Sequence, residues 1–172
     1  MKSNTKKLTT LALFTTLALA IYSVEAALPT LVPIPGIKLG LANIITLIVL
    51  RCLSAKDAFL VLLARIFIAT FLFGQAMSLL YSLAGGILCL LVMVLINKFL
   101  QGHCIYITSI FGALAHQTGQ LIVAVLITSS LAPLTYVPFF VISGCITGLF
   151  TGLCAHFSLK YLTKILFRQL LQ

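Results

Sequence analysis

Six long apolar segments, divided by short polar or Pro- and Gly-containing breaks, constrain this chain more than any other feature. A helix needs about 20 mostly apolar residues to cross the hydrocarbon core of a bilayer. Inside that core a helix bonds all of its own backbone groups. The sequence therefore predicts an all-α membrane protein, with residues 1–172 forming one domain of about six transmembrane helices. The predicted spans are 8–28, 39–53, 58–73, 76–96, 104–129 and 136–157.

Composition excludes the soluble classes of protein. Only 8% of the residues are charged, 62% are hydrophobic, and the mean hydropathy is +1.23, whereas about a quarter of a soluble domain is charged. The net charge of +9 does not indicate nucleic-acid binding, because the cationic residues are scattered between apolar segments and do not form a basic stripe. We expect membrane lipid as a partner and no nucleic acid.

The positions of lysine and arginine predict the orientation. With six spans, one side of the membrane holds nine cationic residues, the opposite side holds Lys38, and Arg65 lies within a span. Cytoplasmic loops carry the excess of positive charge, so both termini are expected in the cytoplasm of a bacterial inner membrane. The nine residues are Lys2, Lys6, Lys7, Arg51, Lys56, Lys98, Lys160, Lys164 and Arg168.

The first apolar segment also has features of a secretory signal. Three lysines precede it, and Val24-Glu25-Ala26 follows it in the manner of a cleavage site. The apolar run is longer than a usual signal core. We therefore expect it to be retained as the first membrane helix.

Several ionisable and amide side chains fall within the predicted spans, where they are costly and often functional. The predicted helix directions place them between the membrane midplane and the outer surface, with Glu25 and Lys38 at the outer rim. We expect an outward-opening pocket suited to an anionic or strongly polar ligand. The alternative is that these groups only satisfy one another between helices. The candidate residues within the spans are Asn43, Arg65, Tyr81, His116, Gln117 and Gln120.

The most distinctive motif is the run LPTLVPIPGIKLGLAN at residues 28–43. Its three prolines stiffen the loop, and Gly36 and Gly40 permit turns or close backbone approach. Gly36 shortly precedes the second helix, whose exposed amide groups favour anions. The run predicts a structured loop that covers the pocket, and the alternative is a simple tight connection.

Small residues recur every fourth position on three predicted helices, including Ser78, Ser82 and Gly86 on the fourth, a pattern that allows close helix packing in lipid. Gly144, Gly148 and Gly152 indicate packing inside the bundle. On the first helix Ala12, Thr16 and Ala20 indicate either internal packing or docking to a partner membrane protein.

Catalytic and metal-binding patterns are lacking in the sequence. There is no GxxxxGK[ST] phosphate loop, and one aspartate, Asp57, cannot make the aspartate cluster that magnesium and a diphosphate require. The histidines lie on different elements and do not form a metal set. The five cysteines lack metal-ligand spacing. We expect neither enzymatic activity nor a cofactor.

Four stretches resemble the bacterial membrane proteins described as heptaprenyl diphosphate synthase component I, or the Gx transporter family. They are PIPGIKLGLANIITL, LLYSLAGGILCLLVM, GALAHQTGQLIVA and SGCITGLFTG. These proteins look related to the substrate-binding S components of energy-coupling factor (ECF) transporters. That resemblance implies a six-helix bundle, a first outer loop over the ligand, and a small-residue face on the first helix for the coupling subunit. Where the family pattern commonly has asparagine after the histidine of the fifth helix, this chain has Gln117.

The resemblance implies an importer subunit that binds a small molecule and works with a transmembrane coupling subunit and two ATPase subunits. In this interpretation Glu25, Gly36 and Lys38 join the residues within the spans as substrate-binding residues. A non-catalytic membrane accessory of a prenyl diphosphate synthase is the alternative that follows from the family's enzyme name. A membrane scaffold without a ligand is the third possibility.

Overall fold

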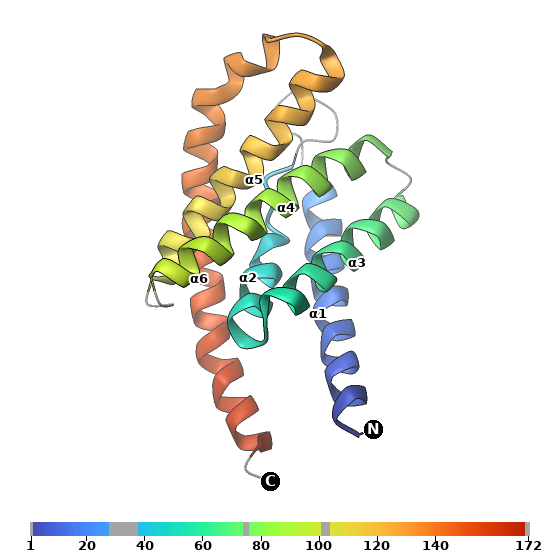
Figure 1. Cartoon of the computed structure of the whole chain (residues 1–172), viewed down its shortest axis with the longest axis vertical. Coiled ribbons are helices and arrows are strands. Elements are labelled where there is room, and N and C mark those ends of the chain that lie inside the picture. The colour runs from blue at the N-terminus through green and yellow to red at the C-terminus, as the bar shows by residue number, and fades with distance from the viewer. Residues whose placement is uncertain (1, 28–37, 74–75, 101–103, 171–172) are drawn as a thin grey trace.

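The computed structural model describes residues 2–27, 38–73, 76–100 and 104–170, and within them it contains six α-helices and no strand. This confirms the predicted all-α membrane bundle (Figure 1). The helices are α1 (Lys2–Ala27), α2 (Asn43–Cys52), α3 (Ala55–Phe73), α4 (Ala76–Phe99), α5 (Ile105–Thr128) and α6 (Val137–Leu170), with a 3-10 helix η1 (Ala132–Tyr136) before α6.

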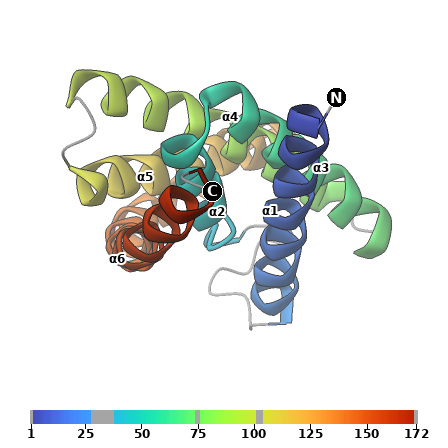
Figure 2. The same cartoon turned by 90° about the horizontal axis from the view of Figure 1, so that it is seen from below.

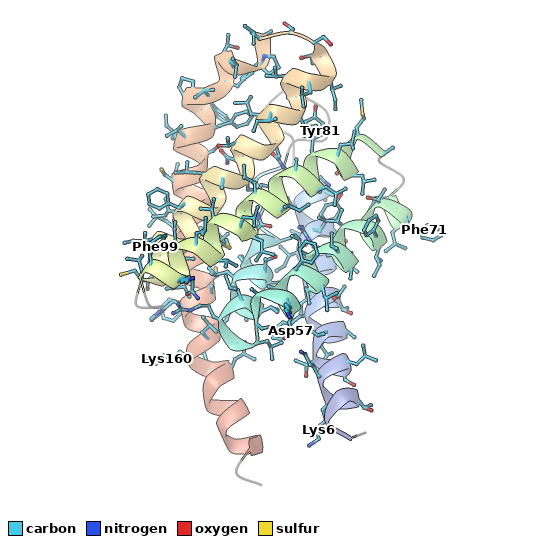
Figure 3. All side chains as sticks on the ribbon, in the orientation of Figure 1. Lys6, Asp57, Phe71, Tyr81, Phe99 and Lys160 are labelled. Atoms are coloured by element: carbon cyan, nitrogen blue, oxygen red, sulfur yellow. The ribbon has the colours of Figure 1, made fainter. Side chains whose placement is uncertain are left out.

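Both ends of the chain lie at the same end of the bundle, and the α5–α6 connection lies at the opposite end (Figure 1). At the end with the termini, Lys7 Nζ is 2.7 Å from Asp57 Oδ1. Arg51 donates a hydrogen bond to Asn97 there, and Lys160 lies toward the same end (Figure 3). The cationic segments are thus gathered as the predicted orientation requires. That this end faces the cytoplasm stays a prediction.

Four helical segments of the described chain are long and apolar enough to cross a membrane: Thr5–Ala27, Ala76–Phe99, Ile105–Thr128 and Ala132–Leu162. The other two helices differ from these for separate reasons. α3 has three charged residues in its first eleven positions. α2 has ten residues, a length of about 15 Å at 1.5 Å per residue, which is half of the hydrocarbon thickness.

The short helix α2 lies in the centre of the bundle and contacts α1, α3, α4 and α6 (Figure 2). Each residue from Asn43 to Leu50 is buried. Leu47, Val49 and Leu62 of α3 are among the fully enclosed side chains of this core. Most residues of this helix are apolar, which suits a position enclosed by other helices.

The glycine stripe of α6 packs against α5, which confirms the prediction of internal packing. A Cβ added to Gly148 would lie 2.6 Å from Ile110 Cα, so the two backbones are in direct contact. Ser109 and Thr151 exchange a hydrogen bond of 2.7 Å across the same interface. Close backbone approach of this kind gives the van der Waals packing that helps helices associate in lipid.

Candidate ligand site

Glu25 joins the end of α1 to the start of α2. Its carboxylate accepts hydrogen bonds from Gly40 N (2.6 Å) and Leu41 N (3.1 Å), in the turn just before α2. The first N–H groups of a helix and of the turn before it have no partner within the helix. An ionised acceptor makes the strongest bonds to such donors. Gly40 has φ +83°, a left-handed conformation that favours glycine. The predicted rim residue therefore fixes this turn.

Arg65 of α3 is 3% exposed and lies near enough to Glu25 and His116 to interact with both electrostatically. It makes no direct ion pair with Glu25 in the part of the chain that the structure describes. Its Nε and Nη2 atoms are buried without a hydrogen-bond partner among those residues. A buried guanidinium with unused donors is costly, and a ligand with acceptor oxygens removes that cost.

His116 and Gln120 of α5 form the opposite wall of the cluster. Gln120 Nε2 donates to His116 Nε2 over 3.0 Å, and Gln120 Oε1 accepts from Lys38 N over 3.3 Å. Because His116 Nε2 is the acceptor, its proton resides on Nδ1. That Nδ1 atom has no hydrogen-bond partner among the described residues, and it lies against Gly85 of α4.

Asn43, the first residue of α2, shares this wall. Its side chain is 4% exposed, and neither its oxygen nor its nitrogen has a partner among the residues described. A Cβ added to Gly40 would lie 2.7 Å from His116 Cδ2 and 2.8 Å from Asn43 Nδ2. Gly40 therefore brings the two side chains together, and no other residue leaves room for them there.

Lys38 completes the charged part of the site. Its Nζ atom lies 3.5 Å from the centre of the Tyr22 ring, a cation–π contact. Like Nε and Nη2 of Arg65, Nζ of Lys38 is buried and lacks a hydrogen-bond partner within the described chain. Tyr22 is held in place by a hydrogen bond of 3.0 Å between its hydroxyl and Ser78 of α4.

The structure brings six of the predicted site residues together and places two elsewhere. The cluster defined by Glu25, Lys38, Asn43, Arg65, His116 and Gln120 is called the polar cluster below. Gln117 points to α6, where its amide meets the Ser143 hydroxyl. Tyr81 packs with Leu121 and Phe140, away from the chain termini (Figure 3). Gly36 lies outside the described residues.

Comparison with protein-family models identifies the family of this chain. The model for heptaprenyl diphosphate synthase component I matches residues 14–158, which include every residue of the polar cluster. The chain belongs to that family. No curated protein and no solved structure matched it.

Sequence reasoning missed two residues that contact the polar cluster in the structure. Tyr22 lies three residues before Glu25, so both share one face of α1, and that spacing was available as a signal. Gly85 is the second. A Cβ there would lie 2.8 Å from His116 Nδ1, so its hydrogen is what admits the imidazole between α4 and α5. The adjacent pair Gly85-Gly86 within an apolar helix was the only hint.

One face of α1 is not covered by other helices of the described structure. Ala12, Thr16 and Ala20 are exposed, while Phe14 and Ala18 face the core. The stripe therefore takes no part in packing the bundle, and it is accessible to another membrane helix. Among the described residues, no three His, Cys, Asp or Glu side chains are placed to hold a metal ion.

Proposed function

We propose that this protein is the substrate-binding membrane subunit, or S component, of an ECF-type importer for a small anionic or polar molecule. The observation that carries the proposal is the polar cluster, which buries unpaired donors of Lys38, Arg65 and His116 with one carboxylate. A bundle needing only mechanical stability gains nothing from such groups, because apolar replacements are often as stable or more stable. Buried ionisable groups in a membrane protein mark a ligand or ion site.

The free stripe Ala12, Thr16 and Ala20 supports the second half of this proposal. Small residues on an exposed face of a membrane helix allow close approach of a partner helix, and the transmembrane coupling subunit is the partner that the resemblance implies. The chain has no phosphate loop of its own. In this proposal ATP is used by the separate ATPase subunits.

The test has two stages. Purification from native membranes, followed by mass spectrometry, identifies the bound small molecule and the co-purifying proteins. Reconstitution in vesicles with those proteins then measures ATP-dependent uptake. The expected result is uptake that needs the coupling and ATPase subunits and that is lost in Arg65→Gln. Uptake without any partner, or equal uptake by Arg65→Gln, would contradict the proposal.

One observation favours a second function. The family description names a component of a heptaprenyl diphosphate synthase, which supports a non-catalytic membrane accessory that anchors a synthase subunit. In that case the co-purifying protein is a soluble prenyl synthase, and its activity in reconstituted membranes depends on this chain. A protein that retains neither a ligand nor a partner, and tolerates changes throughout the polar cluster, is a scaffold.

A further inference from the structure

The unpaired atoms of Arg65 define one edge of its guanidinium group. Nε and Nη2, the two nitrogens without partners among the described residues, carry N–H bonds that point in parallel from the same edge. This is the edge that binds two oxygens of one planar group in a bidentate pair. Arg65 is 3% exposed, so a ligand reaching this edge loses its water. The matching ligand group has two coplanar acceptor oxygens.

The formal charge of the polar cluster limits the charge of that group. Lys38 and Arg65 contribute two positive charges and Glu25 one negative charge, with His116 taken as neutral, which leaves one positive charge in excess. A buried charge without a counter-charge is costly. A ligand with one negative charge brings the sum to zero. A ligand with two leaves an excess negative charge in the same buried place.

From these two observations we propose that the site binds a monoanionic carboxylate through the Nε–Nη2 edge of Arg65 and discriminates against dianionic phosphate groups. The inference rests on the proposed function, since it assigns the chemical class of the transported molecule. Asn43 then bonds to a neutral polar group elsewhere on the ligand, through side-chain atoms that have no partner among the described residues. Prenyl diphosphates, with more than one negative charge, are excluded as ligands of this site.

The experiment uses the purified full-length protein in detergent and measures binding by isothermal titration at pH 7.5. The probes are benzoate, phenyl phosphate and benzyl alcohol, which share an aromatic ring and differ in charge. We expect benzoate to bind at least about tenfold more tightly than phenyl phosphate, because the dianion leaves a buried excess charge. Benzyl alcohol lacks the two oxygens and is expected to bind more weakly than benzoate.

Three variants separate the geometry of Arg65 from the charge of the cluster. Arg65→Lys keeps the charge and loses the parallel donors, so benzoate binding should weaken about tenfold or more. Glu25→Gln raises the excess charge by one, so phenyl phosphate should become the preferred probe. Lys38→Gln removes the excess, so benzoate should lose its advantage over benzyl alcohol. Lys98 is an exposed cation in the last turn of α4. Lys98→Gln is therefore the matched control, and this variant should bind benzoate normally.

The inference is overturned if phenyl phosphate binds the unaltered protein as tightly as benzoate does, or if no probe binds. It is also overturned if the Arg65→Lys protein binds benzoate normally. Should that variant fail to fold, the preference reversal in Glu25→Gln and the loss in Lys38→Gln decide the matter. Failure of the importer role has a different signature. Selective benzoate binding without ATP-dependent uptake would contradict the importer function and support the carboxylate site. ATP-dependent uptake of a phosphate ester would support the importer function and contradict the carboxylate site.

Discussion

The α5–α6 interface offers a matched pair of glycine-to-alanine substitutions on one helix. At Gly148 the new methyl group would lie 2.6 Å from the Ile110 Cα atom. Because this is a backbone atom of α5, no side-chain rotation can relieve the contact. The ordinary contact distance between carbon atoms is about 3.5–4.0 Å, so the two helices must separate by roughly 1 Å. At Gly144 the nearest atom is Leu114 Cδ2, at 2.9 Å. Leu114 lines a shallow groove between α5 and α6, into which its side chain can turn.

The magnitudes follow from that difference. Replacing glycine by alanine within a helix gains about 1 kcal/mol of intrinsic helix stability. Overpacking a tight interface costs about 1–3 kcal/mol. Gly148→Ala should therefore lower the free energy of unfolding by up to about 2 kcal/mol. Gly144→Ala should be neutral or stabilising by up to about 1 kcal/mol.

The assay is unfolding in mixed micelles by titration with sodium dodecyl sulfate, followed by far-ultraviolet circular dichroism. Both variants carry the same chemical change on the same helix, so effects of the micelle cancel in their difference. The reasoning is refuted if Gly148→Ala unfolds at the same detergent fraction as Gly144→Ala, or at a higher one.

Three further predictions concern single contacts. The Lys7 ammonium, and to a smaller extent the Ser54 hydroxyl, lower the pKa of Asp57 below its usual value of 3.8. The ionised Asp57 carboxylate therefore contributes fully to stability above pH 3.8, and this contribution is lost as the pH falls through the lowered pKa. Asp57→Asn should flatten the unfolding profile measured between pH 5 and pH 2. Tyr22→Phe removes a buried hydrogen bond and should cost about 0.5–1.5 kcal/mol in the same unfolding assay, without further loss when Ser78→Ala is added. Gly40→Ala places a Cβ at φ +83° against His116. It should cost at least about 1–2 kcal/mol and abolish retention of the native ligand during purification.

Helix positions were accessible to sequence reasoning because apolar length and polar breaks are local features. Each predicted span corresponds to one helix of the structure, and most bounds differ by a few residues. The largest differences are at the ends of the chain, where α1 begins at Lys2 and α6 continues to Leu170. Helix α2 begins at Asn43, later than the predicted start at residue 39. Glu25 accepts the N–H groups at Gly40 and Leu41, and that contact, made across a turn in the chain, determines where the second helix begins.

The polar cluster was only partly predictable. The distribution of lysine and arginine predicts the direction of each helix, and residue position along the helix predicts depth in the membrane. Together they predicted that Arg65 and His116 lie at a similar depth. The same reasoning included Gln117 and Tyr81, which face α6 and the α5–α6 interface. Depth along a helix follows from residue number, but the face on which a side chain lies depends on helix rotation. In an almost uniformly apolar helix the sequence hardly encodes rotation.

By itself, the sequence determined that the chain forms apolar helices in a bilayer, that its cations gather at one end, and which polar groups must be buried. These results follow from the cost of polar groups in hydrocarbon, which acts on each residue separately. Only the tertiary structure decided which buried groups meet and which of their atoms remain unpaired. That result depends on the rotation and close approach of neighbouring helices. Contacts such as those of Gly40, Gly85 and Gly148 set this geometry, and each joins residues far apart in the chain.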